Sequence, residues 1–360
     1  MRVAVLGGGN GGFAAAADFA EAGHEVRLWR TEAAEAARQN ARGNRITLKD
    51  SRGERVVTLA AVTAELGDAV RGADLVLAPA PATTHSALAP RLAAVLEDGQ
   101  VVFLPPGTLG TIILARALHE ARPGARVAFA ETGTLPWLAR KHGPDLVAIT
   151  VRAKRLPVGV FPLDLAPHAL AEIGAAFPGV IEPCGDALSG ALMNAGPIIH
   201  PPLITMNAGP LQHFEKWDIH KEGTQSSIRR VTDALDGERI AVREALGYAG
   251  PHFPLADHYA KSGPEWCYGR GSHDRLTDSG DWRERIVLTE HRYMREDVRL
   301  GLSLICDAGR AAGVATPLAA AFLAIGGAIC GEDFSQARTL AGCGLPAGAT
   351  ERTRVLRHGF

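Results

Sequence analysis

The stretch VAVLGGGNGG, residues 3–12, decides the fold of this 360-residue chain. Its first four residues are apolar and predict a short buried strand, and the alanine-rich segment 13–22 that follows predicts a helix. Between them, three glycines stand at the spacing G-x-G-x-x-G. In this strand–turn–helix context the glycines let the diphosphate of a dinucleotide approach the backbone at the N-terminus of the helix, which favours this reading over a turn without a ligand. The predicted cofactor-binding residues here are Gly7, Gly9, Asn10, Gly11 and Gly12.

The end of the second predicted strand, residues 25–29, is where such a protein contacts the adenosine ribose. Arg30 and Thr31 stand there. A guanidinium group pairs with phosphate through two hydrogen bonds, so Arg30 favours NADP, with its 2′-phosphate, over NAD. In the alternative, Arg30 only stacks on the adenine, and NAD remains usable. Pro81, in the loop after a further strand at 73–78, is expected to line the same crevice, although a rigid turn without ligand contact explains it equally well.

Alternation of short apolar runs with helical patterns is the main feature of the first half. Strands are predicted at 3–6, 25–29, 73–78, 100–104, 126–130 and 146–152, with helices at 13–22, 33–42 and 86–96. This order indicates βαβ units and a doubly wound parallel sheet. From about Asp186 helical patterns dominate, at 187–195, 239–246, 283–313 and 317–328. The predicted fold class is therefore α/β: a Rossmann-type domain over 1–185 and a mainly α-helical domain over 186–360.

Two further expectations concern the second half. The apolar segment 318–329 is too short to cross a bilayer and predicts a buried helix. The tail after Glu351 is polar, and we expect it to be loosely held.

The composition excludes several classes of protein. The formal net charge is −1, so no basic surplus drives binding to nucleic acid. The five cysteines are widely spaced and form no C-x-x-C motif, which indicates a reducing compartment rather than a disulfide framework. We also expect no targeting segment, no membrane-spanning helix and a cytoplasmic location. A homodimer formed through the helical domain is one candidate assembly.

His200 is the first candidate for chemistry. It stands directly before Pro201 and Pro202, and proline disfavours the helical conformation in the residue that precedes it. We therefore expect His200 at a helix end or turn on the rim of a cleft. An imidazole, with its pKa near neutral, suits proton exchange with a substrate there. A structural role is an equal alternative, because the chain has thirteen histidines.

Asp297 is the second candidate. A helix predicted over 288–312 places it on one face with three small or apolar residues, Gly301, Leu304 and Ala308. A carboxylate on such a buried face needs a partner. His200 is one candidate, because an aspartate would orient the imidazole and stabilise its charged form. A salt bridge to Arg292 or Arg295 is the alternative.

Arg292 is the third candidate. It precedes Asp297 by five residues, about 140° around an α-helix, so the two are expected on adjacent sides rather than on one face. An arginine at such a site holds a substrate carboxylate with two parallel hydrogen bonds. A solvated surface arginine is the alternative reading.

Together these residues resemble the octopine/nopaline (opine) dehydrogenase family across nearly the whole chain. The Asn-to-His-Pro segment is the most specific match, whereas glycerol-3-phosphate dehydrogenases and ketopantoate reductases share the glycine motif. The matching segments are Gly7–Gly12, Glu131–Pro136, Asn194–Pro201, Asn207–Gly209, and Arg292 with Asp297.

The resemblance implies reductive condensation of an amino acid with a 2-oxo acid such as pyruvate, through an imine that NAD(P)H reduces, and the reverse oxidation. It implies that His200 is the general acid/base, Asp297 its partner, Arg292 the carboxylate clamp and Asn194 a substrate-binding residue. The alternative enzyme is a reductase of a simple 2-oxo acid or ketone phosphate. The non-enzymatic alternative is a nucleotide-sensing protein without turnover.

The segment 251–281 is where we expect selectivity for the amino acid. Its histidines show no paired spacing typical of metal ligands, so no metal site is predicted. The candidate residues are His252, His258, Tyr259, Trp266, Tyr268 and His273.

Overall fold

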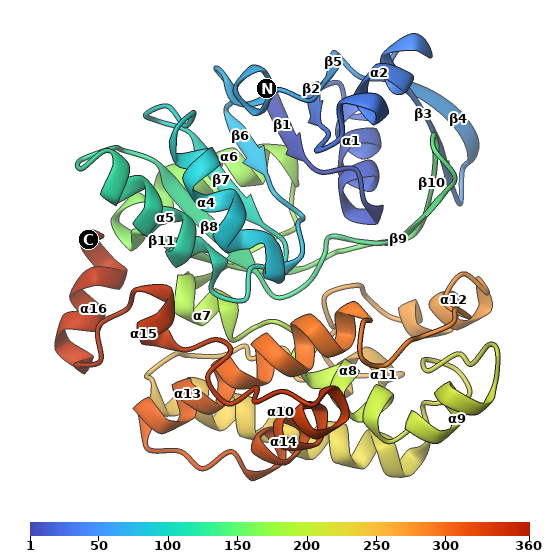
Figure 1. Cartoon of the computed structure of the whole chain (residues 1–360), viewed down its shortest axis with the longest axis vertical. Coiled ribbons are helices and arrows are strands. Elements are labelled where there is room, and N and C mark those ends of the chain that lie inside the picture. Colours follow the sequence, from blue (N-terminus) through green and yellow to red (C-terminus); the bar gives the residue numbers. More distant parts are fainter.

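The computed structural model describes residues 1–360, and its upper half in Figure 1 is built around an eight-stranded sheet. The strand order is β12-β11-β8-β7-β6-β1-β2-β5. All neighbouring strands run parallel except β11, which is antiparallel to β8. The predicted Rossmann-type sheet is thereby confirmed. The strands are β1 (Arg2–Leu6), β2 (Glu25–Trp29), β5 (Ala61–Thr63), β6 (Leu75–Leu77), β7 (Val101–Leu104), β8 (Ala128–Thr132), β11 (Leu156–Phe161) and β12 (Ile181–Asp186).

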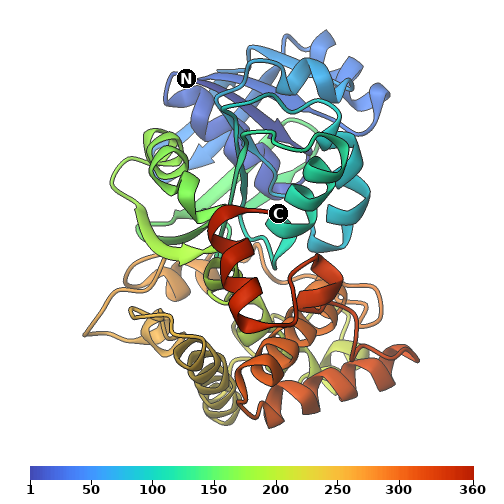
Figure 2. The same cartoon turned by 90° about the vertical axis from the view of Figure 1, so that its left-hand side faces the viewer.

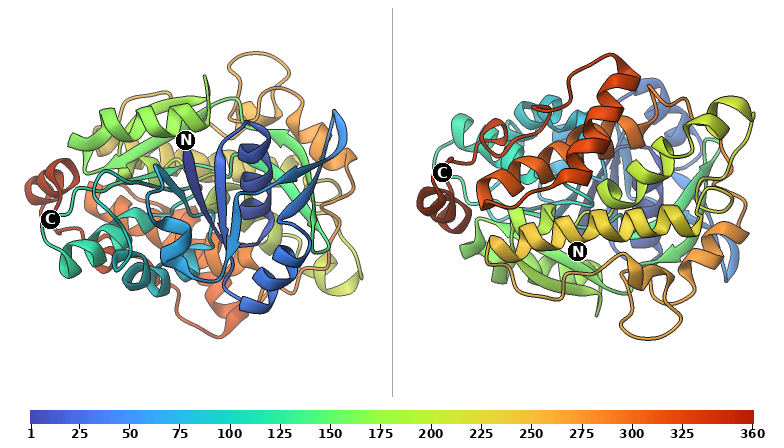
Figure 3. Two further views of the ribbon diagram at one scale, coloured as in Figure 1. Left: turned by 90° about the horizontal axis from the view of Figure 1, so that it is seen from above. Right: turned by 90° about the horizontal axis from the view of Figure 1, so that it is seen from below.

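Helices cover both faces of this sheet because its central strands are apolar on both sides. All residues of β6 and β7 are buried, which is typical of a parallel sheet between two helical layers. Figure 3 shows α1 lying against the strands when the molecule is seen from above. The helices of this half are α1 (Asn10–Glu21), α2 (Ala33–Ala41), α3 (Leu66–Val70), α4 (His85–Ala93), α5 (Gly110–Ala121) and α6 (Ala166–Ala176).

A second, four-stranded sheet has the order β4-β3-β10-β9 and was not predicted. The expected place of 146–152 in the large parallel sheet is wrong, because β10 (Leu146–Arg152) lies in this second sheet, parallel to β3 and antiparallel to β9 (Trp137–His142). The burial of β10 alternates strictly along the strand, as in a sheet with one covered face. The other two strands are β3 (Arg45–Asp50) and β4 (Gly53–Thr58).

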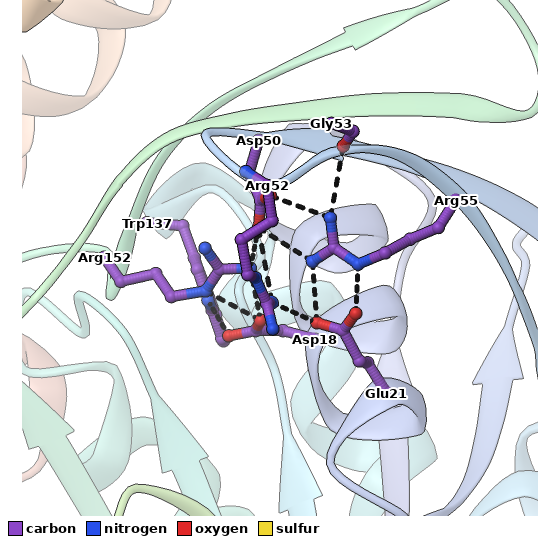
Figure 4. Close-up of polar contacts among 8 residues, drawn as sticks. All are labelled: Asp18, Glu21, Asp50, Arg52, Gly53, Arg55, Trp137 and Arg152. Carbon is purple, nitrogen blue, oxygen red and sulfur yellow. Dashed lines mark hydrogen bonds and ion pairs between the residues drawn. The ribbon is translucent and has the colours of Figure 1, made fainter.

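A network of ion pairs ties this second sheet to α1 (Figure 4). Asp18 of α1 accepts a hydrogen bond from the indole of Trp137 at 2.7 Å and lies 2.8 Å from Arg152. Arg55 of β4 bridges Glu21 and the buried carboxylate of Asp50. Since Trp137 begins β9, the network holds β9 in a defined position against the glycine turn and α1.

We predict that Asp18→Ala destabilises the protein by about 1–3 kcal/mol, because it leaves the buried indole N–H of Trp137 without an acceptor. Glu120→Ala is the matched control: it removes an exposed pair with Arg116, so its effect stays within about 0.5 kcal/mol. Urea unfolding followed by fluorescence measures both. Equal midpoints for the two variants would contradict a structural role for Asp18.

The lower half of the molecule is helical, as predicted, and α10 runs along its base (Figure 3). One predicted helix differs: 283–291 is not helical, and 293–302 forms a π-helix, η3, that continues into α13. None of the helices combines the length and apolar character that crossing a bilayer requires. The elements are α7 (Ala187–Ala191), α8 (Gly196–Thr205), α9 (Ala208–His213), α10 (Ser226–Ala245), α11 (Ala256–Tyr259), α12 (Ser272–Asp278), η3 (Tyr293–Leu302), α13 (Ser303–Ala312) and α14 (Pro317–Cys330).

The expected burial of the apolar segment 318–329 is wrong. α14 packs only one side on the core, through residues such as Phe322 and Leu323, while Ile325 on its outer side is 46% exposed. Half of its residues are alanine or glycine. Because these side chains are small, the outer side of the helix exposes little apolar surface at most positions.

The expected loose C-terminal tail is also wrong. After α15 (Leu340–Cys343), the chain forms α16 (Ala349–His358), which returns to the first half and packs beside the short helix at 163–165 (Figure 2). Phe360 lies 5.4 Å from Phe161, ring centre to ring centre, and His358 pairs with Asp164. A few apolar side chains in a polar segment thus anchor the tail.

The domain boundary at 185/186 remains a prediction.

Candidate active site

A cavity of about 340 Å³ lies where the two halves meet. Its walls come from the glycine turn, the loop after β6, strand β9, helix α8, the segment 255–282 and η3. Of the predicted site residues, the cavity collects eight: Gly9, Asn10, Gly11, Pro81, Asn194, His200, Arg292 and Asp297. Gly7, Gly12, Arg30 and Thr31 do not line it.

The glycine turn has the shape that a dinucleotide needs. Gly7 has a φ of 111°, which only glycine adopts without strain. A Cβ on Gly12 would collide with the carbonyl oxygen of Gly7, so α1 packs against the turn only with glycine there. A Cβ on Gly9 would meet no protein atom, because Gly9 faces the open cavity. The backbone N–H groups at the start of α1 therefore remain accessible to a diphosphate, and these residues fit NAD(P).

Arg30 lies at the end of β2, as predicted, but its side chain is held by the protein. It is 6% exposed, and its guanidinium donates to Gln39 at 3.1 Å and to Glu35 at 2.7 Å. Arg38 donates to the same Glu35 carboxylate. Thr31 is exposed beside this group. One carboxylate therefore partly neutralises two cations beside the glycine turn.

Lys141 of β9 joins these cations and was missed in the sequence. Its ammonium lies 3.3 Å from the carbonyl oxygen of Gly8 and 4.1 Å from the ring centre of Phe13. Burial lowers the pKa of Lys141, and the charge of Arg30 lowers it further. Only the second sheet, which the sequence did not predict, brings this residue from position 141 to the glycine turn.

His200 and Asp297 meet across two helices. Nδ1 of His200 lies 2.7 Å from Oδ2 of Asp297, and both side chains are mostly buried. The imidazole also stacks on Tyr293, with ring centres 3.6 Å apart. The predicted pairing is what the geometry shows, whereas the alternative with Arg295 is not formed, because Arg295 pairs with Glu332.

The expected position of His200 at a helix end is wrong, although it does line the cavity. His200 lies inside α8, and the helix continues through Pro201 and Pro202. Proline removes backbone N–H donors, but the preceding residues can remain helical when tertiary contacts hold them. Here the contacts with η3 supply that support.

Two glycines allow α8 and η3 to approach so closely. A Cβ on Gly196 would collide with Oδ1 of Asp297, and a Cβ on Gly301 would collide with the ring of Pro197. The bond between His200 and Asp297 therefore depends on the absence of two side chains. Gly301 was placed on the Asp297 face of the predicted helix, but its role in the packing depends on α8 and could not be predicted.

The π-helix corrects the expected positions of Arg292 and Asp297. A π-helix closes its hydrogen bonds between residues i and i+5, so residues five apart come to the same side. Arg292, at the start of η3, and Asp297 consequently line the same cavity rather than adjacent sides. The guanidinium of Arg292 forms no salt bridge with any carboxylate and is open to the cavity, as a clamp for a substrate anion must be.

Burial and charge set the protonation of the pair. Burial lowers the pKa of His200 well below 6.5, and the positive charges of Arg292 and Arg140 lower it further. Burial raises the pKa of Asp297 to about 7, against the opposing effect of Arg292. The resting imidazole is therefore neutral and can accept a proton. A substrate carboxylate that neutralises the guanidinium groups would make protonation of His200 easier.

Asn194 precedes α8 and connects it to the first half. Its amide donates to Oγ1 of Thr108 at 2.9 Å, and its carbonyl accepts from the backbone of Gly196 at 3.0 Å. Thr108 has a φ of 51°, which is strained for a β-branched residue and recurs at functional sites. Nothing in the sequence predicted Thr108.

The segment 251–281 contributes to the cavity only in part. It brings His258, Trp266 and Tyr268 to the wall, while His252, Tyr259 and His273 lie elsewhere. Cavity residues that were not predicted include Arg140, His220, Leu255, Leu276, Trp282, Tyr293 and Glu296.

Comparison with known proteins agrees with this geometry. The model of the "NAD/NADP octopine/nopaline dehydrogenase, alpha-helical domain" matches residues 183–330, and that of the "NAD-dependent glycerol-3-phosphate dehydrogenase N-terminus" matches residues 2–105. An opine dehydrogenase of Arthrobacter sp. (strain 1C) is 28% identical over 95% of this chain and 94% of its own. Residues 183–330 thus match the helical domain of octopine/nopaline dehydrogenases, and the chain is similar to an opine dehydrogenase over nearly its whole length.

Further relatives and solved structures are similar over nearly the whole chain. A vitopine synthase of Allorhizobium ampelinum is 26% identical over 96% of this chain and 95% of its own. The fold matches octopine dehydrogenase in complex with NADH and agmatine, with a TM-score of 0.68 and 19% identity over 91% of this chain and 89% of that one. NADP⁺-bound yersinopine dehydrogenase gives a TM-score of 0.66 with 14% identity over 100% and 98% of the two chains. The protein is an NAD(P)-dependent oxidoreductase.

We predict that Gly196→Ala lowers kcat by at least about tenfold, because the new methyl group displaces the Asp297 carboxylate from His200. Binding of NADH, measured by fluorescence titration, should be unchanged. Gly237→Ala is the control, since that glycine lies on the exposed side of α10 with no atom near its Cβ position. Full activity in Gly196→Ala would show that the close helix approach is not needed.

Proposed function

We propose that this enzyme is an opine dehydrogenase that condenses the amine of an amino acid with a 2-oxo acid and reduces the resulting imine, acting on CH–NH donors in the reverse direction. The observation that carries the proposal is the hydrogen bond between His200 and Asp297 beside the unpaired guanidinium of Arg292, in a cavity that reaches the glycine turn. A proton-transfer pair next to an anion clamp is what a carboxylate-bearing imine requires.

Each side chain has a defined task in this scheme. When bound, NAD(P)H supplies the hydride. Arg292 holds the carboxylate of the 2-oxo acid. Because Nδ1 of His200 is engaged with Asp297, Nε2 is the nitrogen that exchanges protons. It takes up the proton that the ammonium group of the amino acid loses before the nitrogen attacks the carbonyl, and it then donates this proton to the hydroxyl group that leaves as water when the imine forms. Asn194 sets the start of α8 and thus the position of His200.

The alternative, a reductase of a simple 2-oxo acid or ketone phosphate, needs no amine. Oxidation of NADH and NADPH by pyruvate, with and without a panel of amino acids, separates the two. Amine-dependent oxidation, with a product of the mass of the secondary amine, supports the opine reaction. Oxidation by pyruvate alone at the same rate would overturn it. Cofactor binding without turnover of any candidate would favour a nucleotide-sensing protein.

We predict that Asp297→Asn lowers kcat by about 10²–10⁴-fold, because it removes the charge that stabilises the imidazolium form of His200. Opine oxidation needs the neutral imidazole as a base, so its rate falls as the pH drops through the pKa of His200, below 6.5. Loss of the carboxylate lowers that pKa further and moves the acidic limb of the pH profile to lower pH.

His200→Ala provides the matching test, since it should abolish the acidic limb along with most of the activity. Titration with NADH should show unchanged cofactor binding in both variants. An Asp297→Asn enzyme with the acidic limb of the wild type would contradict the proposed partnership.

The proposed cofactor preference is NADP. Arg30, Arg38 and Lys141 place three cations near the expected position of the adenosine ribose, and one carboxylate, Glu35, faces them. A net positive charge there favours the 2′-phosphate. Arg30 acts mainly through its charge in this proposal, because its donors already bind Gln39 and Glu35.

We predict that Lys141→Met raises the KM for NADPH about tenfold relative to that for NADH, since only NADPH has the additional phosphate. Lys49→Met, at an exposed lysine paired with Glu54, is the control and should leave the ratio of KM values unchanged. Equal losses for both cofactors in Lys141→Met would contradict the assigned phosphate contact.

The proposal includes a cytoplasmic location, where NAD(P)H and both substrate classes are available, and small molecules as the only required partners. A homodimer through the helical domain remains a prediction that sedimentation can test.

A further inference from the structure

We infer that the amine substrate is an α-amino acid with an uncharged, apolar side chain, and that Arg140 holds its carboxylate opposite Arg292. The inference rests on the proposed function and specifies the substrate class of the same cavity. The evidence for it is the apolar character of one cavity wall and the small number of arginine and acidic side chains that line the cavity.

The wall formed by the segment 255–282 presents mainly hydrocarbon. Leu255, Trp266, Tyr268 and Leu276 are all buried and line the cavity. The hydroxyl of Tyr268 is engaged at 2.7 Å by both Thr134 and the carbonyl oxygen of Leu135. The indole of Trp266 donates to the carbonyl oxygen of Phe253, at 3.1 Å. Their polar atoms are thus consumed within the protein, and their rings remain for contact with an apolar side chain.

The two histidines in this part of the cavity are neutral. His258 lies edge-on to Trp266, with ring centres 4.9 Å apart, and its Nδ1 lies 3.3 Å from Oγ of Ser272. Burial lowers the pKa of His258 to about 3, and His273 and Arg229 contribute. Burial also lowers the pKa of His220 well below 6.5. Neither imidazole therefore offers a charge to an acidic side chain.

The two acidic residues that line the cavity, Glu296 and Asp297, both lie on η3 and not on the wall formed by the segment 255–282. Asp297 is bonded to His200, and Glu296 accepts a hydrogen bond from the backbone of Ala82 at 3.0 Å. At the wall formed by the segment 255–282, a cationic side chain of the substrate would find no carboxylate to pair with. Burying such a charge without a partner is costly, so arginine and lysine should be poor substrates.

Arg140 and Arg292 are the only arginines that line the cavity. The product of the proposed reaction carries two carboxylates, one from each substrate, so two guanidinium groups match them. An additional carboxylate in the amino-acid side chain would have no partner, which disfavours glutamate and aspartate as well.

Arg140 belongs to β9, whereas Arg292 lies at the start of η3. Contacts with neighbouring residues hold the guanidinium of Arg140 in place. Its guanidinium lies 3.7 Å from the ring centre of Trp282, Nη2 donates to Glu284 at 2.9 Å, and Nε donates to the carbonyl oxygen of Asp281 at 3.3 Å. These contacts fix the plane of the group but do not engage Nη1. A fixed guanidinium with a free nitrogen can receive a carboxylate at little entropic cost.

A substrate panel is the first test. With pyruvate and NADH or NADPH, leucine, norvaline and phenylalanine should give kcat/KM values at least about tenfold above those of arginine, lysine and glutamate. A charged amino acid as the best substrate would overturn the inference and leave the proposed function intact. Failure of every amino acid to stimulate oxidation would instead overturn the proposed function.

Leu276→Asp tests the wall directly. A new carboxylate there should raise the ratio of kcat/KM for arginine to that for leucine at least about tenfold. Leu276→Ala is the matched control, since it enlarges the cavity without adding charge and should not favour arginine. The same ratio in both variants would show that this wall does not contact the substrate side chain. NADH titration of each variant confirms that the protein is folded.

Arg140→Met tests the second clamp with leucine and with 3-methylbutylamine, which is leucine without its carboxylate. In the wild type, leucine should exceed the amine in kcat/KM by at least about a hundredfold. In Arg140→Met this ratio should fall at least about tenfold, because only leucine has the carboxylate that Arg140 binds, and Arg140→Lys should restore part of it. An unchanged ratio, or a higher KM for pyruvate alone, would overturn the role of Arg140.

Discussion

The hydrogen bond between His200 and Asp297 is the interaction on which the candidate active site depends, because it joins the two helices that carry the proposed proton-transfer group and the proposed anion clamp. It brings together residues 97 positions apart in the chain. Buried carboxylate–imidazole pairs are strong only in good geometry, so the packing of α8 against η3 must be held closely. Gly196 and Gly301 make that packing possible by removing side chains from the contact.

The π-helix η3 brings two residues to one side that an α-helix would place on adjacent sides. Its wider turn places Arg292 on the cavity side together with Asp297, so one helix supplies both the carboxylate for His200 and the guanidinium for the substrate. The opposite wall depends on a separate support. The ion pairs around Asp18 hold β9 against α1, and β9 carries both Arg140 and Lys141. The second sheet therefore links the cofactor end of the cavity to its substrate end.

Much of the first half could be predicted because its signals are local. The strand at 25–29 coincides with β2, and the helix at 33–42 exceeds α2 by one residue. The sheet of β3, β4, β9 and β10 was missed because it forms only when two local hairpins, β3–β4 and β9–β10, pair through β3 and β10, which lie far apart in the chain. The C-terminal helix α16 was missed for a related reason: two buried residues, Val355 and Leu356, anchor an otherwise polar segment.

The sequence by itself determined the dinucleotide-binding turn, the two-part fold class and the pairing of His200 with Asp297, because short-range patterns and a resemblance over the whole chain carry that information. Only the tertiary structure decided that His200 lies within a helix, that Arg292 and Asp297 share a side, that Arg140 and Trp282 reach the cavity, and that Lys141 reaches the glycine turn. The physical reason is that backbone hydrogen bonding in η3 and contacts between distant segments, not local preference, set those positions.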